Sequence, residues 1–281
     1  MKIVFPMAGR GSRFLAVADQ NPDYRGLKPL IKIKGEPMIH WALKSLSFIN
    51  FPNRPTKTKF KVQPKDLIFI CLEQHQKEHG IIESLKKLFT DKIKVVLIPE
   101  ITRGAAETAL AAAGCVDTNE ELIISDTDHH FDGKYLYKTI LEKEEDIAGV
   151  IPVFRPRTQE PKWSYSLFNK DYIISAVGEK DAELLAKGAY ANIGGYYFTK
   201  AKTFFNEVKN MIQAGDMYGA PGKMEFYVAP VYDRLIKKGM KIKAAITPRV
   251  WGLGTPDDVD YFEKYFKDKK TKKKGKSHKK I

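Results

Sequence analysis

Glycines and basic side chains follow the first apolar run of the chain, in residues 8–13 (AGRGSR). Glycine lets a backbone approach phosphate oxygens closely, and successive N–H groups form a cradle for anions. The guanidinium of Arg13 can hold a phosphate at two points. Phe14 replaces the third glycine of a dinucleotide-binding loop, and the only Gly-Lys-Ser, at 275–277, has no strand before it. The loop therefore predicts a phosphate-binding site that follows neither standard motif.

Two carboxylates follow an apolar run at 122–124, namely Asp126 and Asp128. Carboxylates just beyond a buried strand are common ligands of Mg²⁺, which joins a protein to nucleotide phosphates. His129 and His130 come next and fit either substrate contacts or polar loop positions. The segment predicts a magnesium site.

Two further segments offer contacts to a ligand. Residues 102–108 (TRGAAET) place small side chains at the start of an expected helix, where a flat base can approach the backbone and anions are favoured. Glu179 and Lys180 place a hydrogen-bond acceptor beside a cation, which suits a phosphorylated polyol. Residues 163–165 (WSY) fit either a pocket lining or core packing.

Three linked motifs extend the glycine loop, at residues 6–14 (PMAGRGSRF), 27–31 (LKPLI) and 35–39 (GEPMI). In order and spacing they resemble the N-terminal signature of the nucleotidylyltransferases that activate sugar phosphates: G-x-G-S/T-R, P-K-P-L and G-K/R-P-M-I. Leu27 replaces the first proline, and Glu36 replaces the usual basic residue. The resemblance spans residues 1–262, and its 102–108 segment is similar to a T-x-G-A-A-E-T variant from a branch associated with capsule and surface-glycan genes.

The resemblance implies a nucleotidyltransferase that transfers a nucleoside monophosphate from an NTP to a small phosphorylated acceptor. A sugar 1-phosphate is the expected acceptor, and the products would be an NDP-sugar and pyrophosphate. An anionic phosphate attacks the α-phosphorus of a polyanion in this reaction, so the enzyme must supply positive charge and alignment.

The resemblance also implies roles for single residues. The implied catalytic residues are Arg13 and Lys28. The implied nucleotide contacts are Ala8, Gly9, Gly11, Ser12, Arg13, Gly104, Ala105 and Glu107, and the implied acceptor contacts are Glu179, Lys180, Asn192 and Gly195. The implied metal is Mg²⁺ on Asp128, with Asp126 as the rival ligand.

One position departs from the family pattern where a second metal ligand is expected. The family carboxylate precedes Gly-Thr-Pro in W-x-D-x-G-T-P, whereas residues 251–256 read WGLGTP and Gly252 takes its place. Either one protein carboxylate suffices, or Asp257 or Asp258 reaches the site, or metal binding is impaired. The last case would describe a catalytically weak, regulatory homologue.

Other functions stay open. Glu107 replaces a common family Gln in the base segment, which leaves room for a CTP-dependent cytidylyltransferase acting on phosphocholine or a phosphorylated amino-acid amide. A module that binds nucleic acid weakly through a lysine-rich C-terminus is a further alternative, although no helix-turn-helix or RNA-binding motif supports it. Residues 75–79 (HQKEH) match a zinc-hydrolase pattern, but without a third ligand in context we expect a polar helix face.

These segments need a scaffold, and short β-branched runs alternate with helical patterns as in a parallel sheet covered by helices. The expected fold class is α/β, a Rossmann-like doubly wound, mixed but mostly parallel sheet flanked by helices. We expect one domain over 1–266, with a nucleotide-binding half (1–154), an acceptor-binding half (155–266) and ligands beyond the carboxyl ends of the strands. Expected strands are 3–5, 67–72, 95–98, 122–124, 147–153, 164–168, 172–177, 192–198 and 242–246. Expected helices are 37–49, 81–89, 105–115, 134–141, 204–212, 226–236 and 256–266.

The charge of the chain is concentrated in two places. Lysine and arginine number 48 against 34 acidic residues, a net charge of +14. Residues 267–280 hold nine lysines and one aspartate, and residues 54–65 hold one arginine and four lysines without an acid, so the rest carries about +1. We expect residues 267–281 to be disordered, because a lysine-rich end cannot bury a core.

The composition also indicates which cell compartment and which partners to expect. Cys71 and Cys115 are expected to be small core residues in a reducing compartment. No apolar stretch is long enough to span a membrane and no signal peptide is recognisable, so we expect a cytoplasmic protein without a membrane partner. The expected partners are an NTP and a small phosphorylated acceptor, and the sequence is compatible with a homo-oligomer.

Overall fold

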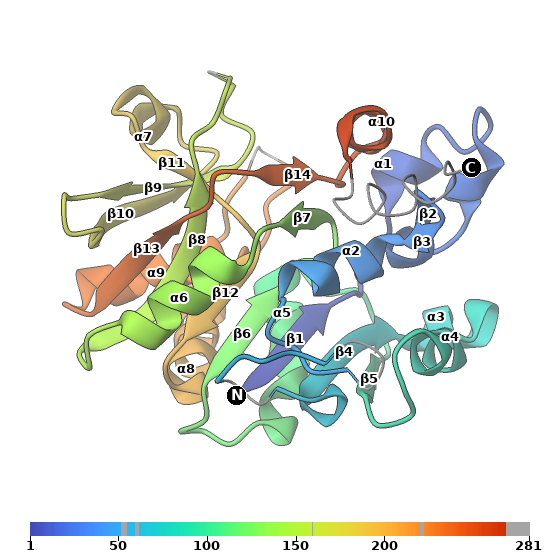
Figure 1. The fold of residues 1–281 in the computed structure, drawn as a ribbon, viewed down its shortest axis with the longest axis horizontal. Coiled ribbons are helices and arrows are strands. Elements are labelled where there is room, and N and C mark those ends of the chain that lie inside the picture. The colour runs from blue at the N-terminus through green and yellow to red at the C-terminus, as the bar shows by residue number, and fades with distance from the viewer. Residues whose placement is uncertain (52–54, 60–61, 159, 220–221, 268–281) are drawn as a thin grey trace, which may run out of the picture.

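The computed structural model describes residues 1–51, 55–59, 62–158, 160–219 and 222–267. Its centre is a ten-stranded sheet in the order β10-β9-β11-β8-β12-β6-β1-β4-β5, with β13 paired to β8 (Figure 1). A parallel block consists of β1 (Lys2–Pro6), β4 (Leu67–Leu72), β5 (Lys94–Ile98) and β6 (Leu122–Ser125). The remaining strands are β8 (Ile147–Phe154), β9 (Ser164–Phe168), β10 (Ile174–Glu179), β11 (Tyr190–Asn192), β12 (Gly195–Phe198) and β13 (Lys241–Ile246).

The strand directions make this sheet mixed and mostly parallel. β12 runs antiparallel to both of its neighbours, β6 and β8, and so joins the two parts. Of the ten described strands only β10, β11 and β12 run against the rest. The structure confirms the expected α/β class, and the sheet contains strands from both of the expected halves.

Alternation along the strands divides the core between two faces. In β1, Val4 belongs to one buried cluster while Ile3 and Phe5 belong to the other, and in β6 Ile124 and Ile123 divide in the same way. The first face is covered by α5 (Ala105–Ala109), α8 (Ala201–Ala214) and α9 (Ala229–Lys237). The second is covered by α2 (Met38–Ser45), α4 (Ile81–Leu88) and α6 (Lys134–Glu142).

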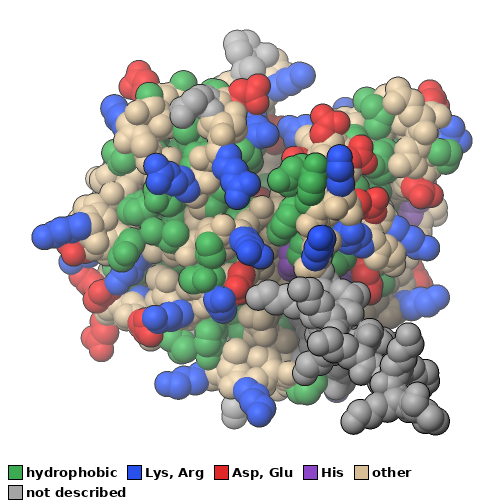
Figure 2. Space-filling view, turned by 45° about the horizontal axis from the view of Figure 1, so that its top comes forward, with side chains coloured by type: hydrophobic (Ala, Val, Ile, Leu, Met, Phe, Trp, Pro, Cys, Tyr) green, Lys and Arg blue, Asp and Glu red, His purple; other side chains and the backbone are tan. Residues whose placement is uncertain are grey.

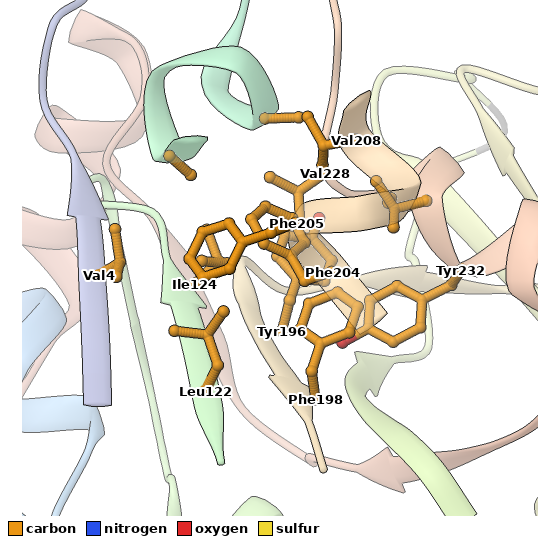
Figure 3. Packing of buried hydrophobic residues seen from close by; sticks show 14 of the residues in the cluster. Val4, Leu122, Ile124, Tyr196, Phe198, Phe204, Phe205, Val208, Val228 and Tyr232 are labelled. Carbon is orange, nitrogen blue, oxygen red and sulfur yellow. The ribbon is translucent and has the colours of Figure 1, made fainter. Parts of the chain in front are cut away.

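The first face shows how such packing fixes the strands. Phe204 and Phe205 of α8 and Tyr232 of α9 lie over Ile124 and Phe198 of the sheet (Figure 3). Phe198 and Tyr232 stack with ring centroids 4.5 Å apart. Burying one such side chain contributes about 1.5–3 kcal/mol, so this face holds the ends of β6 and β12 firmly in place.

Smaller elements lie beyond the sheet. α1 (Ser12–Leu15), the β2–β3 hairpin (Lys32–Ile33, Glu36–Pro37) and α10 (Pro256–Tyr265) come together at one end of the molecule (Figure 1). Phe14, Trp41 and Phe262 share a separate buried cluster there. A two-stranded ladder pairs β7 (His129–Phe131) with β14 (Val250–Gly252). α3 (Glu73–His79) and α7 (Ala182–Ala186) complete the described α-helices.

Several expected elements differ from the structure. The expected helix 105–115 is an α-helix only over Ala105–Ala109 and continues as a 3₁₀ helix over Leu110–Cys115. The expected strand 172–177 lies at Ile174–Glu179, and the expected helix 204–212 is longer, at Ala201–Ala214.

Three other differences have causes that the structure shows. The expected strand 192–198 is two strands, because the chain turns at Gly194, whose carbonyl accepts a hydrogen bond from the Asp126 N–H (2.8 Å). The expected helix 226–236 begins only at Ala229, because the Phe226 N–H donates to the carbonyl of Arg103 (2.8 Å). The expected helix 37–49 ends at Ser45, after which the backbone of Leu46 leaves the helical region.

The described residues also test smaller expectations. Cys71 and Cys115 are both free thiols, and Cys71 is fully buried. No helix in the described part of the chain has the length and apolarity to cross a membrane. Residues 268–281 of the basic tail, and part of the basic 54–65 segment, lie outside the described residues.

Candidate functional site

The glycine loop and the aspartates meet because their strands are neighbours. β1 and β6 are parallel, with Val4 opposite Ile124, so their carboxyl ends lie side by side. The glycine loop follows β1 and Asp126 follows β6. Gly9, Ser12 and Arg13 are exposed on this loop, whereas Ala8 is buried. The loop therefore presents backbone N–H groups and a guanidinium to solvent beside the carboxylates.

Gly11 connects the loop to Lys28. It adopts a left-handed φ of 66°, and a Cβ there would lie 3.1 Å from the Cβ of Lys28. Lys28 opens a 3₁₀ turn (Lys28–Leu30), and its Nζ donates to Oδ2 of Asp128 at 2.6 Å. Lys28 and Asp128 are 22% and 31% exposed, so the ion pair stays accessible to a ligand. Two residues singled out on separate motifs are thus in direct contact.

The two aspartates are held in different protonation states. Burial raises the pKa of Asp126 to about 7, and the charge of Asp128 adds to the rise while Lys28 opposes it. Burial also acts on Asp128, but the charge and hydrogen bond of Lys28 outweigh it and hold the pKa of that carboxyl below its usual value. Asp128 is therefore ionised at neutral pH, and Asp126 is close to its midpoint.

Three potential metal-binding groups converge here. One carboxylate oxygen of Asp126, one of Asp128 and one ring nitrogen of His129 lie within 4.8 Å of one another. Carboxylate oxygens suit a divalent cation, so the residues fit the expected metal. Both rival aspartates belong to the same group of ligands. His129, expected as a substrate contact or a polar loop residue, also belongs to this group, and its position next to Asp128 at a strand end is the sequence signal for it.

The base segment is packed against a distant part of the chain. Gly104 has a φ of 147°, and a Cβ there would lie 2.6 Å from both the N and O atoms of Phe226. Backbone contact with Phe226 thus accounts for this glycine without any ligand. Glu107 accepts hydrogen bonds from the N–H and guanidinium of Arg103, at 2.6 and 2.5 Å, and Ala105 is half-buried. Nothing in the sequence pattern of 102–108 had pointed to Phe226.

Glu179 and Lys180 lie at the end of β10. Burial raises the pKa of Glu179 to about 7, Asp126 and Glu225 push it in the same direction, and Lys180 opposes them. Lys180 takes a left-handed φ of 53°, and its Nζ donates to the hydroxyl of Tyr227 at 3.0 Å. The electrostatic influence of Asp126 indicates that this segment lies near the aspartates.

The side-chain amide of Asn192 makes two hydrogen bonds inside the protein. Ser166 donates to its Oδ1 at 2.7 Å, and its Nδ2 donates to Oγ of Ser164 at 3.0 Å. All three residues are buried, so Asn192 joins β9 to β11. At Gly195 a Cβ would lie 3.2 Å from the ring of Phe131, and the space beside Gly194 is taken by the Asp126 carboxylate. A side chain at either glycine would therefore meet other side chains of the protein.

The position without a family carboxylate lies opposite His129. Gly252 pairs with His129 in the β7–β14 ladder. A Cβ at Gly252 would lie 3.3 Å from the carboxyl carbon of Asp258, and one at Gly254 would lie 3.2 Å from Oδ2 of Asp128. The Asp258 carboxylate accepts from the hydroxyl of Thr255 at 2.7 Å and caps α10. Asp258 is therefore near the site but is occupied at a helix terminus.

Two histidine patterns have structural explanations. Nδ1 of His75 accepts a hydrogen bond from the Leu72 N–H (3.4 Å) at the start of α3, and the ring of His79 lies 3.7 Å from Glu78. These contacts agree with a polar helix and give no support to zinc chemistry at 75–79. Nδ1 of His130 lies 3.0 Å from the carbonyl of Trp41, so His130 faces away from the aspartates into the cluster around Trp41.

Comparisons with known proteins identify the fold. No family model and no curated protein matches the sequence. A nucleoside-diphosphate-sugar pyrophosphorylase from Vibrio cholerae has a similar structure, with a TM-score of 0.69 and 19% identity over 93% of this chain and 99% of that one. An inositol-1-phosphate CTP transferase from T. maritima gives 0.63 and 14% over 97% and 93%. A Bacillus anthracis structure assigned as a glucose-1-phosphate thymidylyltransferase gives 0.65 and 15% over 95% and 97%. At these identities the similarity establishes a common fold.

Proposed function

We propose that the chain is a nucleotidyltransferase that joins a nucleoside monophosphate from an NTP to a small phosphorylated acceptor and releases pyrophosphate. The observation that carries the proposal is the contact of Lys28 with Asp128 (2.6 Å) beside the exposed glycine loop. A cation, a phosphate cradle and a carboxylate pair lie where parallel strands of this fold end, and they match the chemistry of a polyanionic substrate. The names of the three similar structures support the same reaction class.

In this proposal the protein aligns the reactants and does no covalent work. The glycine loop and Arg13 hold the triphosphate, and Lys28 neutralises charge near the transferred phosphoryl group. A divalent cation, proposed to be Mg²⁺ on Asp128 and Asp126, would neutralise phosphate charge when bound. Glu179 and Lys180 orient the acceptor, and an oxygen of the acceptor phosphate forms the new bond to the α-phosphorus as the bond to the β-phosphate breaks. Pyrophosphate leaves with the electron pair.

The preferred acceptor is a sugar 1-phosphate, in line with the names of two of the similar structures. A cytidylyl transfer to a non-sugar phosphate is the second candidate, and the T. maritima protein gives it a precedent in this fold. Glu107 is tied to Arg103, so the base segment does not favour one nucleotide.

Pyrophosphate release tests the proposal directly. The full chain is incubated with Mg²⁺, each of the four ribonucleoside triphosphates or dTTP, and glucose 1-phosphate, inositol 1-phosphate or phosphocholine. We expect pyrophosphate release with one pair of nucleotide and acceptor, and no release when either member of that pair is omitted. A folded protein that releases no pyrophosphate with any pair would overturn the proposal.

Lys28→Ala then tests the phosphate assignment. We expect turnover to fall by about 10²–10³, because one charge aimed at the transferred group is lost. The matched control is Lys32→Ala, which removes an exposed lysine from β2 and should leave turnover unchanged. Full activity in Lys28→Ala would refute the role of this lysine without refuting the reaction.

A further inference from the structure

The buried ring of His129 packs against Phe131, with ring centroids 5.3 Å apart, but this contact leaves one of its nitrogens unexplained. His129 is only 6% exposed, and its Nε2 has no hydrogen-bond partner among the described residues. A buried polar atom without a partner costs about 1–3 kcal/mol, so such a group calls for an explanation. Its cross-strand neighbour in β14 is Gly252, which has no side chain with which to satisfy the ring.

The surroundings of His129 point to a cation. A ring nitrogen lies within 4.8 Å of carboxylate oxygens on both Asp126 and Asp128. An imidazole with an ordinary pKa is largely neutral at physiological pH and keeps a lone pair on one ring nitrogen. A neutral imidazole beside two carboxylates has the composition of a mixed nitrogen and oxygen ligand set.

We propose that His129 is the third protein ligand of the divalent-metal site, and that this site prefers a first-row transition ion to Mg²⁺. Mg²⁺ takes oxygen ligands almost exclusively and holds its water tightly, whereas imidazole nitrogen strengthens binding along the series from Mn²⁺ to Zn²⁺. The inference deepens the proposed function by naming the metal class, but binding of the metal does not depend on turnover.

Co²⁺ is a suitable probe because it binds nitrogen ligands and its X-ray absorption reports on them. Calorimetric titration of the metal-free full chain should give a Co²⁺ affinity at least about tenfold above that for Mg²⁺. His129→Asn should weaken Co²⁺ binding by at least about tenfold and change Mg²⁺ binding much less. His79→Asn, which removes a half-exposed histidine, is the matched control and should change neither.

Two outcomes would overturn the proposal. The first is equal affinity for Co²⁺ and Mg²⁺ in the wild-type protein. The second is a wild-type Co²⁺ absorption-edge spectrum without imidazole scattering. The spectrum decides the question even if His129→Asn fails to fold. Imidazole-bound Co²⁺ in a protein that releases no pyrophosphate with either Mg²⁺ or Co²⁺ would uphold this site and reject the proposed reaction, so the two failures are distinguishable.

Discussion

At the scale of a single residue, Glu179 shows how burial couples a binding group to stability. Its pKa rises from an ordinary value of 4.5 to about 7 because the carboxyl is buried, with Asp126 and Glu225 adding to the effect. The folded-state pKa lies above the unfolded value, so the folded form binds the proton more tightly. The resulting stabilisation is complete below about pH 4.5 and is lost as pH rises towards about 7.

Glu179→Gln should therefore change stability in a pH-dependent way. At pH 8 we expect the variant to be more stable than the wild type by about 1–3 kcal/mol, with little difference near pH 4, because no buried charge forms. Melting temperatures across this pH range provide the measurement. Glu183→Gln is the control, since that carboxylate is 87% exposed on α7. A wild type and variant with parallel pH profiles would contradict the raised pKa.

The same substitution, Glu179→Gln, should weaken binding of the phosphorylated acceptor. A carboxylate hydrogen bond contributes about 1.5–3 kcal/mol, so the KM for the acceptor should rise by about tenfold or more at pH 8 while the KM for the NTP stays constant. This residue would then be more useful to binding than to folding. An unchanged acceptor KM would remove Glu179 from the acceptor site.

At the scale of elements, Gly104 and Gly9 both follow a strand of the sheet, but they have different structural roles. Gly104 brings the start of α5 against the backbone of Phe226, whereas a Cβ at Gly9 would meet no protein atom within 4 Å. Gly104→Ala should cost about 2–4 kcal/mol, because its φ of 147° and the Phe226 backbone both exclude a side chain. Chemical denaturation measures this loss.

Gly9→Ala is the matched partner of that experiment. We expect its stability to change by less than about 0.5 kcal/mol. Its turnover should nevertheless fall by about tenfold or more, because the new methyl group would occupy space reserved for phosphate oxygens. A stable Gly9→Ala protein with full turnover would show that the loop does not approach the triphosphate.

The parallel block could be predicted from sequence because its signals are local. The runs 67–72 and 122–124 are apolar and β-branched, and they became β4 and β6 with boundaries within one residue. The turn at Gly194 could not be predicted, because its carbonyl accepts a hydrogen bond from the N–H of Asp126, almost 70 residues away in the chain. The β7–β14 ladder could not be predicted either, because each strand has only three residues and carries no recognisable alternation.

The candidate site divides in a similar way. Motif spacing pointed to Lys28 and Asp128, which are in contact. Other expected site residues are held by remote segments that no local pattern indicates: Phe226 packs against Gly104, and Ser166 donates a hydrogen bond to Asn192. His129 was visible in the sequence, but only its burial and its unpartnered Nε2 distinguish it from a polar loop residue.

At the scale of the whole molecule, the uneven charge separates the body from the tail. On the face in Figure 2, lysine and arginine side chains are scattered among acidic and apolar ones and form no continuous basic patch. The cations of the candidate site are few: Arg13 lies in α1, Lys28 in a 3₁₀ turn, and Lys180 directly after β10. A net charge of +14 therefore does not describe the surface that would meet a substrate.

Truncation after Phe266 tests this separation. Phe266 stacks on Phe262 at 4.4 Å and meets Trp41 at 5.2 Å, so a chain that ends there keeps the aromatic cluster behind α10. Turnover should stay within about twofold of the full chain, because every residue of the proposed site precedes Phe266 in the sequence. Retention on a heparin column should instead fall sharply, since nine lysines are lost and polyanion binding follows the number of cations. A truncated chain that folds but loses turnover would place the tail in the reaction, whereas unchanged heparin retention would move polyanion binding to the body.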